Sequence, residues 1–226
     1  MKYVLLSFAF VPFFSFSQEK KMGIGIMVSP DYCSRTNIQM GSIEKAKPGL
    51  TVGGSFFYTV NSFIAIETGV FYANKGTQTD YQELFLGSQI NPQTGFSGGT
   101  PFKIKFIYNY NYVDIPVKIG FKLFGEKVKF IVAGGLNTSF FLSEKTTSVK
   151  IENGRKSKTK QNVTSYYHHS PVIFSPMLGI ATNIQLNEYT SLRIEPVYRF
   201  SVTPILKDGT SKFYSLGINL GITRSF

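Results

Sequence analysis

Apolar and polar residues alternate with a period of two along most of this chain. In the C-terminal segment one parity is apolar apart from Arg224, and the other parity consists of glycine and small polar residues. Because successive side chains of a β-strand point to opposite faces, this pattern predicts a strand with one apolar and one polar face. The same pattern recurs in seven further segments, at about residues 22–28, 50–58, 64–73, 113–123, 128–142, 174–186 and 192–201. The sequence therefore predicts an all-β fold with eight strands.

The connections between these segments alternate strictly between short and long. The short ones are residues 60–62, 125–127 and 187–188, and the long ones are about residues 31–48, 76–107, 143–171 and 203–212. Outer-membrane barrels sort their connections in this way, with short periplasmic turns and long external loops. We therefore expect an eight-stranded antiparallel up-and-down transmembrane β-barrel in the outer membrane. An even strand count places both termini in the periplasm.

A soluble lipocalin-like barrel is the main structural alternative. It would turn the apolar parity inward and expose the polar parity to water. The polar parity here is rich in Gly, Ser and Ala, which suits a crowded interior, and the chain has no Trp. Lipocalins usually carry a Gly-x-Trp motif near the first strand. The membrane barrel, which satisfies every backbone group by closure, is favoured.

The first residues are typical of an export signal. A short charged start is followed by an apolar run over residues 4–16, and small residues lie at 15 and 17. This pattern predicts a signal peptide at residues 1–17, cleaved before Gln18, and a barrel domain at residues 18–226. The run is too short to cross about 30 Å of hydrocarbon.

The net charge limits the class of binding partner, and the single cysteine limits disulfide formation. The net charge is +11, and it falls to +10 when Lys2 is removed with the signal peptide. On an exported protein this basic balance indicates lipid phosphate as a partner rather than nucleic acid. Cys33 has no second cysteine with which to form an internal disulfide. We expect no cofactor and no metal site, since the adjacent His168 and His169 would point to opposite faces.

The stretch YNYVDIPVKIG at residues 110–120 resembles the fourth-strand signature of the PorT-like outer-membrane barrel family of Bacteroidota. The Gly-Ile-Gly-Ile segment at residues 23–26 and the last strand, which ends at Phe226, are also similar to that family. The resemblance implies the barrel fold over nearly the whole mature chain. The founding member serves type IX secretion, but that role is not carried over, and no catalytic or binding residue transfers.

Charged residues occur on the polar parity, which would face the barrel interior. They are Glu67, Asp114, Lys118, Lys122, Lys129, Arg193, Glu195 and Arg199. Charges enclosed in a narrow lumen must pair, so we expect the three acids to be set against the basic groups. Lys122 and Lys129 lie near a predicted periplasmic turn and can reach water. A proton or ion path is one interpretation, but a polar plug that fixes strand register is favoured, and no open pore is expected.

The third long connection is strongly basic. Asn153-Gly154 is a two-residue hairpin signal. The basic residues around it that we predict to contact lipid phosphates are Lys150, Arg155, Lys156, Lys158 and Lys160. A solvated loop tip is the alternative interpretation. The second long connection carries Phe85, Phe96 and Phe102, which suggests that it folds over the barrel mouth or meets a partner.

One arrangement with catalytic potential can be proposed. His168, Ser170 and Glu144 share the outward parity near a predicted rim, similar to a lipid A deacylase with His168 as base, Ser170 as nucleophile and Glu144 orienting the imidazole. The rest of that family's pattern is missing. The leading function is therefore a non-enzymatic structural or accessory barrel whose external loops contact lipopolysaccharide or a larger membrane-protein complex, such as secretion or assembly machinery. A lipid A-modifying hydrolase is the runner-up, and a narrow transport channel ranks third.

Overall fold

The computed structural model describes residues 21–36, 44–86, 100–124, 127–162 and 169–226. These residues form ten β-strands. The strands are β1 (Met22–Arg35), β2 (Glu44–Thr59), β3 (Ile64–Thr79), β4 (Gln82–Leu86), β5 (Thr100–Phe124), β6 (Val128–Glu152), β7 (Arg155–Asn162), β8 (Val172–Gln185), β9 (Thr190–Phe200) and β10 (Phe213–Ser225). The described residues contain no helix that is long and apolar enough to cross a membrane. The predicted signal peptide lies outside the described residues.

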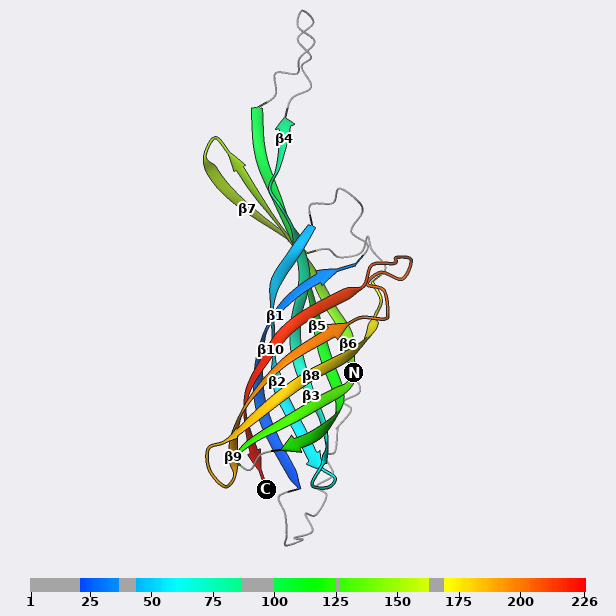
Figure 1. The fold of residues 1–226 in the computed structure, drawn as a ribbon. Helices are drawn as coiled ribbons and strands as arrows, with labels where there is room; N and C mark the ends of the chain where they lie inside the picture. The colour runs from blue at the N-terminus through cyan, green and yellow to red at the C-terminus, as the bar shows by residue number, and fades with distance from the viewer. Residues whose placement is uncertain (1–20, 37–43, 87–99, 125–126, 163–168) are drawn as a thin grey trace, which may run out of the picture.

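Eight of the strands close into a ring. Their order is β5-β3-β2-β1-β10-β9-β8-β6, and the pairing of β5 with β6 joins the two ends. Every neighbouring pair in the ring is antiparallel. Figure 1 shows these strands inclined around one axis. The predicted eight-stranded antiparallel barrel is confirmed, and closure leaves the ring without an exposed strand edge.

Side chains alternate between the outer wall and the lumen as the pattern predicted. Along β10 every second residue is buried, and the residues between them, among them Leu216, Ile218 and Ile222, are exposed. The outer wall is therefore apolar, whereas the lumen holds small, polar and charged groups. A lipocalin-like barrel, with its apolar parity inside, is excluded by this arrangement.

Two of the three tight turns are fixed by the same local device. The Oδ1 atom of Asn61 accepts hydrogen bonds from the backbone N–H groups of Phe63 and Ile64 at 2.9 and 2.8 Å. Asn187 does the same for Tyr189 and Thr190 at 3.0 and 2.9 Å. Asparagine side chains favour such turns because they replace a backbone acceptor. These turns lie at the same end of the barrel as the C-terminus (Figure 1), which we call the turn end.

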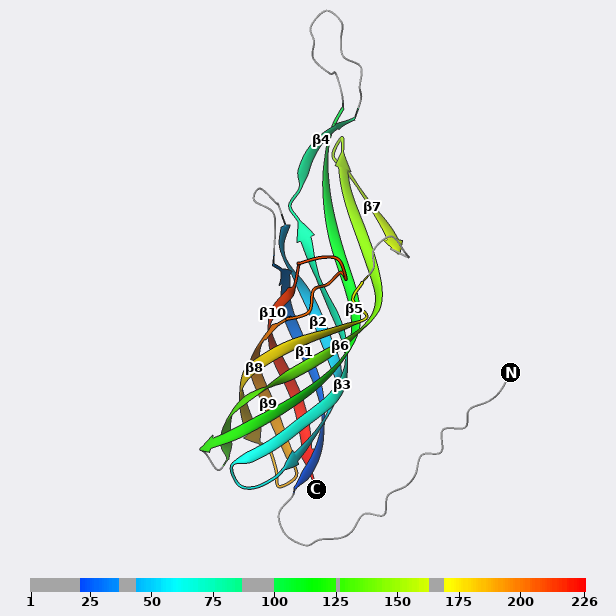
Figure 2. The same cartoon turned by 90° about the vertical axis from the view of Figure 1, so that its right-hand side faces the viewer.

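The opposite end carries strands where the sequence predicted loops. β5 and β6 continue well past the ring, and β4 and β7 pair with their outer halves to give a four-stranded sheet in the order β4-β5-β6-β7. Figures 1 and 2 show this sheet rising from one side of the barrel, and we call it the extension. The prediction of long loops at residues 76–107 and 143–171 was therefore wrong for the described parts. The outer strand β7 holds no apolar residue. On the outer half of β5 the apolar residues Phe102, Ile104 and Phe106 are even-numbered, whereas the outward apolar residues of the ring part are odd-numbered, so the alternation seen in the ring does not continue there with the same parity.

The predicted hairpin at Asn153-Gly154 forms the tip between β6 and β7. Both residues have a positive φ, 49° for Asn153 and 73° for Gly154. These values match the two-residue turn whose twist suits an antiparallel pair, which is why Asn-Gly is favoured there.

Candidate functional site

A block of alternating ion pairs fills the middle of the lumen. Lys118 Nζ lies 2.8 Å from Glu67 Oε1 and 3.1 Å from Glu195 Oε2. Arg193 Nη2 lies 2.9 Å from Glu67 Oε2 and 3.2 Å from Glu195 Oε2. All four side chains are buried, and Glu195 is fully enclosed. Each carboxylate is thus held between two cations, which is the geometry that enclosed charges require.

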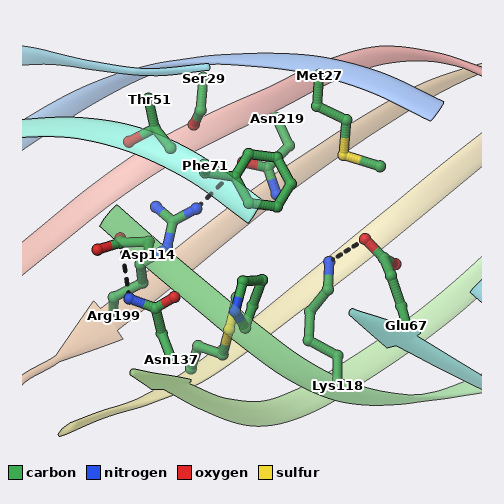
Figure 3. Close-up of a pocket in the computed structure, with 12 residues that line it drawn as sticks. Met27, Ser29, Thr51, Glu67, Phe71, Asp114, Lys118, Asn137, Arg199 and Asn219 are labelled. Atoms are coloured by element: carbon green, nitrogen blue, oxygen red, sulfur yellow. Dashed lines mark hydrogen bonds and ion pairs between the residues drawn. The ribbon is translucent and has the colours of Figure 1, made fainter. Parts of the chain in front are cut away.

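A second set of ion pairs lies in the lumen nearer the end of the barrel that is opposite the turn end. Asp114 Oδ2 lies 2.9 Å from Lys75 Nζ, and the same oxygen accepts a hydrogen bond from Asn137 Nδ2 at 2.9 Å. Arg199 Nη1 lies 2.9 Å from Asp31 Oδ1. Figure 3 shows Asp114, Asn137 and Arg199 together on one side of this space, with Lys118 and Glu67 facing each other on the other.

Sequence reasoning missed the buried Lys47, which donates to Asn74 Oδ1 at 2.7 Å, and among the paired residues it missed Asp31 and Lys75. Both lie at or just beyond the end of a segment with clear alternation, so they were left in or next to predicted loops. With them the enclosed pairs balance, because the bases Lys75, Lys118, Arg193 and Arg199 face the acids Asp31, Glu67, Asp114 and Glu195. Lys122 is half-buried and Lys129 is exposed, and both lie toward the turn end.

An aromatic cluster packs above the ion pairs, at the mouth opposite the turn end. It consists of Tyr110, Tyr112, Ile173, Ile205 and Phe213, all buried. The ring of Phe213 meets the two tyrosine rings edge-on, with centroids 5.4 and 6.1 Å apart. Ile205 comes from the connection between β9 and β10, so this connection folds inward over the mouth.

Glu144 and His169 lie beside this cluster. Glu144 Oε2 is 2.8 Å from His169 Nε2, and the imidazole ring also packs against Phe141 with centroids 4.4 Å apart. The imidazole is charged in this contact only when it is protonated, and the contact does not have the directed geometry of a hydrogen bond. Burial raises the pKa of Glu144, and the neighbouring His169 partly offsets that rise.

The proposed catalytic arrangement does not have the predicted geometry. Glu144 and Ser170 are buried at the mouth, 6% and 5% exposed, and do not lie on an outward-facing rim. His168 lies outside the described residues. The cause is a β-bulge in β6: Asn111 pairs with Ser143 and Tyr112 pairs with Phe141, which leaves Leu142 as an extra residue. The extra residue reverses the parity beyond it, so Glu144 turns inward.

No group of three or more His, Cys, Asp or Glu side chains suited to a metal ion occurs among the residues that the structure describes. The contacts at the mouth bring together a carboxylate, an imidazole and aromatic rings, but these groups are packed against one another.

The extension gathers lysines on one of its faces, which we call the lysine face. Strand register places Lys103, Ile151 and Lys156 in one cross-strand row. Lys105, Val149 and Lys158 form the next row. With Lys145 and Lys160, which share the same parity, the face holds six lysines: Lys103, Lys105, Lys145, Lys156, Lys158 and Lys160. Val149 is buried between them, as expected where lysine stems cover an apolar residue.

Five basic residues of the third connection were predicted to act together, and the structure separates them. Lys156, Lys158 and Lys160 lie on the lysine face, whereas Lys150 and Arg155 have the opposite parity. Lys150 is 2.9 Å from Glu152 Oε2, and its ammonium lies 4.5 Å from the ring centroid of Phe102. Lys103 and Lys105 were missed because they precede Lys156, Lys158 and Lys160 by more than 50 residues along the chain. Only the pairing of β5 with β6 brings them to this face.

The lysine face continues the outer wall of the barrel. On β5 the odd-numbered residues Val117 and Ile119 are exposed on the outer wall, and Lys103 and Lys105 have the same parity further along the same strand. Among the described acidic residues, Glu83 on β4 pairs with this face, 2.9 Å from Lys103. The face is therefore strongly positive and stands directly beyond the apolar band.

Comparison with known proteins gives a family. Residues 13–222 match the family model of the outer membrane protein beta-barrel domain. No curated protein sequence matches the chain significantly. Among solved structures, Neisserial surface protein A is 12% identical with a TM-score of 0.49, covering 91% of this chain and 97% of that one. OprG from Pseudomonas aeruginosa is 11% identical with a TM-score of 0.46 and the same coverage, 91% and 97%.

Ail of Yersinia pestis is 12% identical with a TM-score of 0.38, covering 92% of this chain and all of that one. These low identities say nothing about a shared activity. The family match spans nearly the whole chain and agrees with the closed ring, the apolar outer wall and the charged lumen. The chain belongs to the outer membrane protein β-barrel domain family and is an integral protein of the outer membrane.

Proposed function

We propose that this protein is a non-enzymatic accessory barrel of the PorT-like type, whose lysine face binds the phosphate groups of lipopolysaccharide at the cell surface. The observation that carries the proposal is the arrangement of six lysines on one face of the extension, directly beyond the apolar band of the barrel.

The orientation follows from the sorting of the connections. Tight turns occupy one end of the ring together with the C-terminus, and the extension occupies the other. Barrels of this kind keep tight turns in the periplasm and longer elements outside. The turn end and both termini therefore face the periplasm, and the extension stands outside the cell.

In this orientation the lysine face meets the layer that holds lipid phosphates. Lys103 and Lys105 have the parity of the lipid-facing residues on the same strand, so they point toward neighbouring lipid rather than over the lumen. Ammonium groups bind phosphate oxygens by charge-assisted hydrogen bonds. Neighbouring strands lie about 4.8 Å apart and alternate residues about 7 Å apart, so several lysines can reach one phosphorylated headgroup.

The lumen supports an accessory role rather than transport. Four bases and four acids are paired inside it, and the aromatic cluster packs over them. A conducting path would have to break enclosed ion pairs, which is costly. The hydrolase alternative gains no support, because Glu144 and Ser170 are buried.

The test compares two variants with equal loss of charge. In one, Lys156, Lys158 and Lys160 are replaced by Gln; in the other, Lys150, Arg155 and Lys207, which lie off the lysine face, are replaced by Gln. We expect the first variant to lose most of its association with lipopolysaccharide vesicles and the second to retain it. The wild-type association should weaken with salt, as contacts between exposed charges do.

Equal loss in both variants would refute a specific face, and unchanged binding in both would refute the proposal. A protein partner retained by the first variant in pull-downs from outer membranes would favour a role in a larger complex. The enzymatic alternative is tested by lipid A mass profiles from wild type, Ser170→Ala and a deletion strain. We expect three identical profiles, and a product missing from both mutants would contradict the non-enzymatic role.

A further inference from the structure

We propose that the turn end of the lumen is a binding site for a small soluble anion of the phosphate or carboxylate class, entering from the periplasm. Entry from the periplasm depends on the orientation proposed above, whereas the site itself depends only on the geometry of the lumen. A cavity of about 270 Å³ lies there, below the ion pairs of Glu67, Lys118 and Arg193, which form part of its lining.

The cavity exists because small residues line this part of the lumen. Ala65, Gly120 and Ala133 contribute little or no side-chain volume to its wall. Register places Ala65, Gly120 and Ala133 in one cross-strand row on β3, β5 and β6. The paired charges fill the middle of the lumen, whereas the turn end is hollow.

The wall of the cavity is basic. Lys118, Lys122, Lys129 and Arg193 line it, against Glu67 and Glu188. Lys118 and Arg193 are already shared between Glu67 and Glu195. Lys122 and Lys129 are nearer the opening, where Lys122 Nζ makes a long contact of 3.4 Å to Thr59 Oγ1 and Lys129 is exposed. Basic groups therefore surround the entrance as well as the inner wall.

A buried polar atom in the same wall has no partner among the described residues. Asn183 Oδ1 is enclosed and makes no hydrogen bond. Strand register puts Asn183 between Lys129 on β6 and Arg193 on β9. The Asn183 amide therefore lies between two cations in the wall of the cavity.

The size and polarity limit the ligand to a small anion. One water needs about 10–15 Å³ of such a volume, so the cavity has room for a phosphate or a small organic acid. Ser191, Thr223 and Ser225 add hydroxyl groups to the wall. A phospholipid headgroup would have to draw its acyl chains through the barrel wall, so a soluble ligand fits better than a lipid.

The experiment uses the absence of Trp from the chain. A Tyr189→Trp variant places one fluorophore in the lining of the cavity, and inorganic phosphate is titrated into the refolded full barrel in a maltoside detergent. We expect a saturable fluorescence change. Adding Lys122→Gln and Lys129→Gln should weaken the affinity by about tenfold or more, since both charge-assisted contacts are lost. Adding Lys127→Gln and Arg224→Gln instead, which lie outside the lining at the same end, should leave it unchanged.

Each variant must show the gel shift between unheated and boiled samples that marks a folded barrel. Equilibrium dialysis of radiolabelled phosphate with the unaltered chain gives a second measurement that does not depend on Trp. No saturable binding at millimolar phosphate in either assay, or equal weakening in both charge variants, would overturn the proposal. These assays report binding whichever way the barrel faces, so they fail independently of the lysine face.

Nanodiscs separate the two sources of phosphate. In nanodiscs of phosphatidylglycerol without added phosphate, we expect the same Trp emission as in phosphatidylcholine. A changed emission that added phosphate cannot increase would assign the site to a lipid headgroup and overturn the soluble ligand.

Discussion

Strands β5 and β6 each pass through two environments, and their two halves use the same geometry with different chemistry. In the barrel, the outward residues of β5 are apolar, as Val117 and Ile119 show, and its inward residue Lys118 is paired and buried. In the extension, Lys103 and Lys105 occupy the outward parity of the same strand. The backbone pairing continues across the boundary, so hydrogen bonding alone does not mark where the membrane ends.

This difference shows that the alternation of side chains indicates a strand, whereas the residue types on each face of the strand indicate which medium that face meets. Lipid on one side and a narrow lumen on the other force apolar residues outward and paired charges inward. Outside the lipid band this constraint is removed, and lysines can collect on one face, where Lys103 pairs with Glu83. Three substitution pairs, each with one member in the barrel and one in the extension, test this comparison.

The largest difference is expected between a buried and an exposed carboxylate. Glu195→Gln leaves Lys118 and Arg193 with Glu67 as their remaining ionised partner, which should cost about 3–5 kcal/mol of unfolding free energy. Glu152→Gln in the extension breaks the partly exposed pair with Lys150 and should cost about 0–1 kcal/mol. Urea unfolding of the refolded barrels measures both, and similar costs would mean that the lumen is well hydrated.

The next difference concerns the outer wall. Val117→Arg places a charge against lipid and should cost about 2–4 kcal/mol near the bilayer midplane. Ile151→Arg lies on the lysine face of the extension, between Lys103 and Lys156, where we expect about 1 kcal/mol at most. Unfolding from lipid vesicles gives the ranking. The reverse order would mean that the membrane boundary has been placed at the wrong height.

The smallest difference concerns glycine. Gly154→Ala at the hairpin tip forces a side chain into a φ of +73° and should cost about 1–2 kcal/mol, confined to the β6–β7 hairpin. Gly134→Ala in the barrel half of β6 meets no atom closer than 3.8 Å and should be near neutral. Hydrogen exchange would show faster exchange in β7 alone for the first variant. Faster exchange in the ring would show that the extension and the barrel unfold as one unit.

The elements that the sequence predicted well are those with lipid on one side. All eight ring strands were identified, because the outer wall had to be apolar at every second residue. Asp31 and Lys75 were missed because each lies past the last residues of a clear apolar alternation, where a charged residue is typical of a loop. Glu144 was placed on the wrong side, because the bulge at Leu142 shifts parity and leaves no mark in the pattern of apolar residues.

The lysine face shows the limit of local patterns. The basic hairpin around Asn153-Gly154 was visible in the sequence, but Lys103 and Lys105 join it only through pairing between β5 and β6. The same pairing assigns Lys150 and Arg155 to the opposite face. A count of lysines along the chain could not assign them to two faces, since neighbouring residues on a regular strand point to opposite faces.

The sequence by itself determined the strand number, the alternation and the sorting of short and long connections, because each is a local consequence of a strand between lipid and lumen. Tertiary structure alone decided which charges pair, where parity reverses and which lysines share a face. Those features depend on register between segments far apart in the chain. A shift of one residue reverses every side chain, and only ring closure with its enclosed ion pairs fixes that register.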